Sequence, residues 1–94
     1  MKTRRRLEIF PNEKLAKASI DEFYNKNLED ISFYDRVLKT LLYKDTYIGF
    51  RTESYSTRLE GLTFNEIYIH PDCKYRSSYI PQVIRNKAKI VYKV

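Results

Sequence analysis

Alternation of hydrophobic and polar residues predicts four short strands. It is clearest over residues 5–10 and 46–52, where apolar side chains occupy every second position, the period that gathers them on one face of a sheet. Residues 62–69 are rich in β-branched and aromatic side chains, and the tail over residues 89–94 alternates lysine with apolar residues. Both patterns favour strands, and lysines on the solvent side are typical of an edge strand.

Apolar residues at helical spacing predict three helices. Asn12 is suited to cap a helix over residues 13–26, and Ser32 with Asp35 resembles a capping box before a second helix that extends to residue 42. A short third helix is expected over residues 77–87. The short connection between the first two predicts an antiparallel helical hairpin.

The expected fold is therefore α/β or α+β: a single mixed sheet packed against the helical hairpin and the third helix. The order is strand, helix, helix, strand, strand, helix, strand. The predicted core positions are Leu38, Leu41, Phe64, Ile67, Ile69, Ile84 and Ile90.

Composition indicates one domain over residues 1–94, with residues 1–6 forming a basic arm. Hydrophobic residues make up 43% of the 94 residues, enough for a small core. Cys73 is the only cysteine, so an intramolecular disulfide is excluded and a reducing compartment is favoured. No apolar run has the length of a membrane span. We expect a cytoplasmic protein without a membrane partner.

Positive charge is concentrated at the two ends of the chain, within a net charge of +6. The central two thirds is slightly acidic. If the ends meet in the fold, they form one patch that attracts phosphate backbones, although the same charge could serve only solubility. The candidate nucleic-acid-binding residues are Lys2, Arg4, Arg5, Arg6, Lys74, Arg76, Arg85, Lys87, Lys89 and Lys93.

Catalytic chemistry has few candidates. His70 and Cys73 are the only histidine and the only cysteine, so a nucleophile dyad would need both, and a zinc site would need further ligands. The simpler interpretation is a histidine at a strand end and a cysteine in a loop. We expect no catalytic residue, no metal site and no cofactor.

Two resemblances to known families bear on the fold. Residues 57–70, from Thr57-Arg58-Leu59 to Ile69-His70, resemble the Walker-B strand region of phage terminase and helicase ATPases. That likeness implies an α/β arrangement. The chain has only two glycines and no glycine-rich phosphate loop, so ATP hydrolysis is not expected.

The predicted topology, with the segment Asp72-Cys73-Lys74-Tyr75-Arg76, is similar to RelE-type toxins, which cleave messenger RNA without a metal. This resemblance implies basic groups that stabilise phosphate charge, and a tyrosine or another group that moves protons. The chemically suitable residues are Arg51, Arg58, Arg76, Arg85 and Tyr92.

Three functions follow as hypotheses. The leading one is a small non-enzymatic accessory protein, of a phage type, that binds DNA or RNA, or a nucleic-acid-processing protein, through its basic face. The second is a protein-interaction module that inhibits a host complex through exposed tyrosines and the slightly acidic helical hairpin. The third is a RelE-like, metal-independent ribonuclease.

Overall fold

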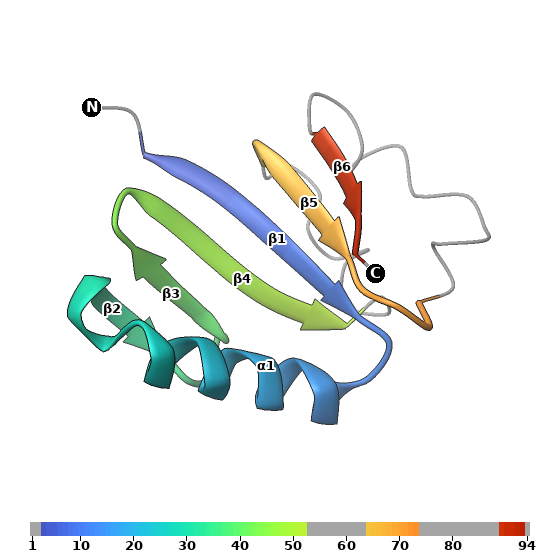
Figure 1. Cartoon of the computed structure of the whole chain (residues 1–94), viewed down its shortest axis with the longest axis horizontal. Coiled ribbons are helices and arrows are strands. Elements are labelled where there is room, and N and C mark those ends of the chain that lie inside the picture. Colours follow the sequence, from blue (N-terminus) through green and yellow to red (C-terminus); the bar gives the residue numbers. More distant parts are fainter. Residues whose placement is uncertain (1–2, 53–63, 74–88, 94) are drawn as a thin grey trace.

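The computed structural model describes residues 3–52, 64–73 and 89–93. These residues form one six-stranded mixed sheet with the strand order β2-β3-β4-β1-β5-β6 (Figure 1). β1 is parallel to both β4 and β5, β5 is parallel to β6, and the β2-β3 and β3-β4 pairs are antiparallel. The elements are β1 (Arg4–Phe10), α1 (Glu13–Lys26), the 3-10 helix η1 (Leu28–Asp30), β2 (Ile31–Asp35), β3 (Thr40–Tyr43), β4 (Thr46–Thr52), β5 (Glu66–Ile69) and β6 (Lys89–Tyr92).

The single mixed sheet and its four sequence-predicted strands are confirmed as β1, β4, β5 and β6. The first helix also begins and ends as the sequence predicts. The side-chain oxygen of Asn12 accepts a hydrogen bond from the Leu15 amide at 2.9 Å, which satisfies one of the free donors in the first helical turn. The predicted third helix over residues 77–87 lies outside the described residues.

The predicted second helix over residues 32–42 is wrong, because this segment forms the β2-β3 hairpin. The carboxylate of Asp35 accepts from the amides of Val37 and Leu38 at 2.9 and 3.0 Å, so it closes a turn instead of following a helix cap. Lys39 has a φ of 50°, a left-handed conformation that a helix does not contain. The order of elements within residues 3–52 therefore differs from the expected one, since two strands, β2 and β3, stand where the second helix was predicted.

The core has a cluster on each side of the sheet. On the side where α1 packs, Ala16 and Ile20 meet Phe10, Leu41, Ile48 and Phe50. On the other side lie Leu7, Ile9, Ile67, Ile69 and Cys73. We call these the helix side and the opposite side, and successive residues of each strand alternate between them.

The core predictions were largely confirmed within the described residues. Leu41, Ile67 and Ile69 are fully buried, and Phe64 and Ile90 are partly buried against the opposite-side cluster. Leu38 is a wrong prediction, since 57% of it is exposed at the β2-β3 turn. Ile84 lies outside the described residues.

None of the helices formed by the described residues is long and apolar enough to cross a lipid bilayer.

Candidate nucleic-acid interface

The two basic ends of the sequence meet on the sheet. β1 carries Arg4 and Arg6, and β6 carries Lys89, while β5 pairs with both strands and lies between them. Arg6 and Lys89 are both in register with Glu66 of β5, and register partners in parallel strands share one face of the sheet. All of these side chains therefore belong to the helix side.

Glu66 holds two of the three arginines of β1. Its carboxylate lies 3.7 Å from a guanidinium nitrogen of Arg4 and 3.7 Å from one of Arg6. The Arg4 side chain is 50% exposed and that of Arg6 is 26% exposed, so these pairs are worth at most about 1 kcal/mol each. They orient both arginines; Arg4 stays half exposed, whereas most of the Arg6 side chain is buried.

The ring of Tyr68 is the point at which the two ends converge. The guanidinium carbon of Arg6 lies 4.6 Å from the ring centroid, and the Lys93 ammonium lies 5.2 Å from it. Both distances are within the range of cation–π attraction. The hydroxyl of Tyr68 donates to Glu66 at 3.2 Å, so one tyrosine links β1, β5 and the residue that follows β6.

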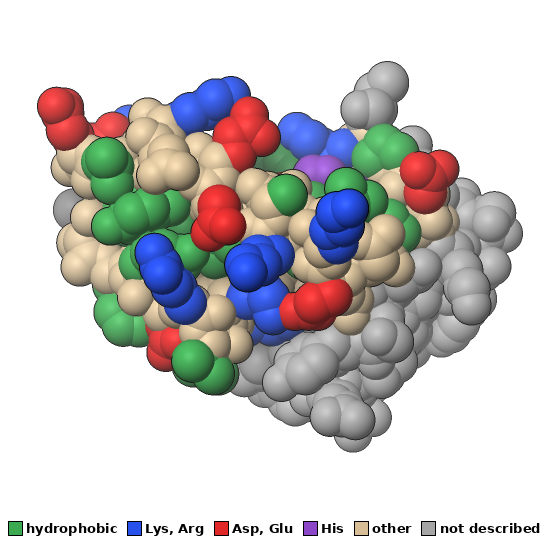
Figure 2. Space-filling view, turned by 90° about the horizontal axis from the view of Figure 1, so that it is seen from below, with side chains coloured by type: hydrophobic (Ala, Val, Ile, Leu, Met, Phe, Trp, Pro, Cys, Tyr) green, Lys and Arg blue, Asp and Glu red, His purple; other side chains and the backbone are tan. Residues whose placement is uncertain are grey.

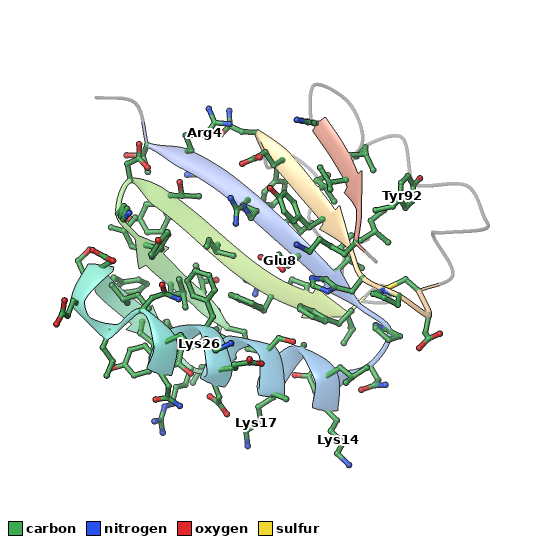
Figure 3. The ribbon with its side chains drawn as sticks, in the orientation of Figure 1. Arg4, Glu8, Lys14, Lys17, Lys26 and Tyr92 are labelled. Carbon is green, nitrogen blue, oxygen red and sulfur yellow. The ribbon has the colours of Figure 1, made fainter. Side chains whose placement is uncertain are left out.

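We call this surface the basic face and define it by four basic residues, Arg4, Arg6, Lys89 and Lys93, around Glu66 and Tyr68. In Figure 3, Arg4 lies at the end of the sheet where β1 and β5 begin, and Lys14 and Lys17 of α1 point away from the sheet. The basic face is thus distinct from the charged outer surface of the helix.

Glu8 and His70 form a second polar contact on the helix side, toward the carboxyl ends of β1 and β5. A carboxylate oxygen of Glu8 lies 2.7 Å from His70 Nε2, and the imidazole stacks on Phe10 with the ring centroids 4.0 Å apart. Arg6 lies 4.0 Å from the other Glu8 oxygen. In the space-filling view from below, the histidine surface is small and adjoins basic side chains (Figure 2).

His70 and Cys73 do not form a dyad. His70 lies on the helix side with Glu8 and Phe10, whereas Cys73 is buried in the opposite-side cluster, where its thiol contacts the Ile9 carbonyl at 3.4 Å. Among the residues in the described ranges, no group of three or more His, Cys, Asp and Glu side chains is placed to hold a metal ion.

The predicted site residues separate into three groups. Arg4, Arg6, Lys89 and Lys93 come together on the basic face, while Arg5 belongs to the opposite side of β1. Lys2, Lys74, Arg76, Arg85 and Lys87 lie outside the described residues.

The residues named for a RelE-like reaction do not come together in the described part of the chain. Arg51 belongs to β4 and Tyr92 to the edge strand β6, and two strands, β1 and β5, lie between them. Arg58 lies outside the described residues, as do Arg76 and Arg85.

Sequence reasoning missed Glu8, Glu66 and Tyr68. Glu8 lies 62 residues from His70, and no local pattern indicates that parallel pairing of β1 with β5 brings them together. A signal was present for Tyr68, because a tyrosine on the polar face of a strand between two basic strands is a natural cation–π partner. Finding it required the strand order.

Comparison with known proteins gives no match: no family model matches the chain, and neither a similar curated protein nor a similar solved structure was found.

Proposed function

We propose that the protein binds nucleic acid through the basic face, by contacts with the phosphate backbone. The observation that supports this most directly is the convergence of Arg6 and Lys93 on Tyr68. Charges from opposite ends of the sequence act there as one surface, and a polyanion that binds it releases condensed counterions.

The charge balance of the basic face favours an anion but limits the affinity. Four basic side chains surround Glu66, and Glu8 adds a second carboxylate near Arg6. Four phosphate contacts from these side chains would contribute about −3.6 to the slope of log K against log salt for duplex DNA, or about −2.8 for a single strand. Contacts of this kind position a nucleic acid and do not read its sequence.

Lys89 and Lys93 provide the cleanest test because both are exposed and neither supports Glu66 as the arginines do. We expect the double variant Lys89→Ala/Lys93→Ala to bind random-sequence oligonucleotides more weakly, with a slope shallower by about two. Fluorescence anisotropy over a salt series measures both quantities. The matched control is Lys14→Ala/Lys17→Ala, which removes the same charge from the outer surface of α1 (Figure 3).

If both double variants lose affinity equally, binding follows net charge and the basic face is not the site. If the parent protein binds no oligonucleotide at low salt, the proposal is wrong.

A protein-interaction module is the second candidate, supported by the tip of the β2-β3 hairpin. Val37 is 87% exposed and Leu38 57% exposed, and adjacent apolar residues on a projecting turn are suited to contact another protein. Val37→Ser/Leu38→Ser would then abolish the biological activity while leaving oligonucleotide binding unchanged. The nucleic-acid proposal predicts the reverse: the biological activity survives this change and is lost in the double variant Lys89→Ala/Lys93→Ala.

A further inference from the structure

A row of side chains crosses the opposite side of the sheet, away from α1. Phe33 of β2, Leu42 of β3, Tyr47 of β4 and Arg5 of β1 are successive register partners. Phe33 is 46% exposed and Tyr47 is 37% exposed, and their rings make an edge-to-face contact with centroids 6.4 Å apart. Two exposed aromatic rings and an arginine therefore share one face.

A cavity of about 330 Å³ lies at the Tyr47 end of this row. Its walls include Arg5, Tyr47 and Arg51, with Leu7 and Phe64 as apolar neighbours. None of the described residues that line it is acidic. This volume is at the lower limit for ligand pockets, so it suits one planar ring system and is too small for a larger molecule.

Gly49 leaves room for the Arg51 guanidinium beside the cavity. The atoms nearest to a β-carbon at Gly49 would be those of the Arg51 guanidinium, at 3.5 to 3.6 Å. That guanidinium is fixed by hydrogen bonds, since it donates to the backbone carbonyls of Lys39 and Phe50 at 2.9 and 3.1 Å and to the Thr40 hydroxyl at 2.9 Å. The planar cation is thus held over Gly49 before any ligand arrives, which lowers the entropic cost of binding.

We infer that this cavity, the Gly49 pocket, receives one base of a single-stranded nucleic acid, held against Tyr47 and the Arg51 plane with its phosphate toward Arg5. The inference rests on the proposed function and extends it to single strands. Aromatic rings and guanidinium planes on a sheet stack unpaired bases. Duplex bases stack on one another and do not reach such a pocket. The arginines among the described wall residues favour an anionic ligand.

Filling the pocket is the most direct test. Gly49→Val adds methyl groups beyond a β-carbon position that already lies 3.5 Å from the Arg51 guanidinium, so it displaces that group and should lower the melting temperature. A thermal melt of the variant shows that it stays folded. Binding of a single-stranded homopolymer should weaken by about fivefold to a hundredfold, the range for loss of one base stack. Binding of duplex DNA should change by less than about twofold.

Tyr47 provides a second variant that does not depend on the fit of valine. Tyr47→Ala should weaken single-strand binding in the same range, while Tyr47→Phe keeps the ring and should bind like the parent. Tyr92→Ala is the matched control, since Tyr92 is 48% exposed on the edge strand β6. Equal losses for duplex and single strand, or no loss for either, would overturn the inference and leave the basic-face proposal intact.

If the parent binds no oligonucleotide, the proposed function fails, and adenosine monophosphate tests the pocket alone. Titration followed by amide NMR should then shift the signals of Gly49 and Tyr47 in the parent and not in Gly49→Val. The absence of such shifts would overturn the inference as well.

Discussion

On the helix side, the two halves of one sheet are built from opposite kinds of side chain. Where α1 covers β3 and β4, Leu41, Ile48 and Phe50 are buried in an apolar cluster. Where β1, β5 and β6 lie beyond the helix, the same side carries Arg6, Glu66 and Tyr68. A strand face is apolar where another layer removes it from water, and charged where side chains must pair with one another.

The largest effect is expected in the apolar half. Leu41→Ala should lower the free energy of unfolding by about 2–5 kcal/mol, because the side chain is fully buried and its removal leaves a cavity under α1. Thermal or denaturant unfolding measures this loss. Leu38→Ala, three residues earlier but 57% exposed, is the control and should change stability by less than about 0.5 kcal/mol. Similar losses for both would contradict the hairpin.

A smaller loss is expected in the charged half. Glu8→Ala removes a buried carboxylate and leaves His70 without its 2.7 Å partner, which should cost about 1–3 kcal/mol. A double-mutant cycle with His70→Ala separates this contact from the packing on Phe10, and a coupling above about 0.5 kcal/mol is expected. Additive losses would show that the two side chains do not interact.

Two substitutions at Tyr68 distinguish the contribution of its ring to the basic face from that of its hydroxyl. Tyr68→Phe keeps the cation–π contacts and removes only the hydrogen bond to Glu66, so it should cost about 0.5–1.5 kcal/mol. Oligonucleotide affinity should stay near that of the parent. Tyr68→Ala removes the support of Arg6 and Lys93 and should weaken binding as well, which anisotropy would detect. Equal binding by both variants would show that the ring does not organise the cations.

The smallest effect is a pH dependence in the apolar half. Burial, and then the Asp21 carboxylate that accepts its hydrogen bond at 3.1 Å, raise the pKa of Tyr34. The folded pKa is therefore above the unfolded one. The contribution of Tyr34 to the free energy of unfolding is fully present below about pH 10, the ordinary pKa of tyrosine. It is lost as the pH rises through the folded pKa. Tyr34→Phe should flatten the alkaline fall in unfolding free energy, and an unchanged profile would assign the fall to other groups.

The segment over residues 31–43 shows why one sequence pattern supports two structures. Its apolar residues fit a helical stripe, yet Val37 and Leu38 of that stripe are exposed and Leu41 is buried. As a hairpin, the segment pairs β3 with β4 through four register partners. A helix would leave that edge of β4 with unpaired backbone groups. The hydrogen bonds between β3 and β4 outweigh the weak local preference of the segment for a helix.

Of the candidate site, the sequence predicted only the positive charge. The basic ends are visible in the sequence, but their union depends on β5 lying between β1 and β6. The Gly49 pocket had no sequence signal, since Arg5, Tyr47 and Arg51 meet through strand register. Residue types reveal which chemistry is present, and register decides which groups meet.

The sequence alone determined β1, α1 and β4, because alternation and the Asn12 cap act over a few neighbouring residues. It also determined where positive charge is concentrated. Only the tertiary structure decided the hairpin over residues 31–43, the Glu8–His70 contact and the arrangement around Tyr68. The last two depend on pairing between strands far apart in the chain, and the hairpin depends on pairing of β3 with β4. Such pairing is determined by the whole sheet.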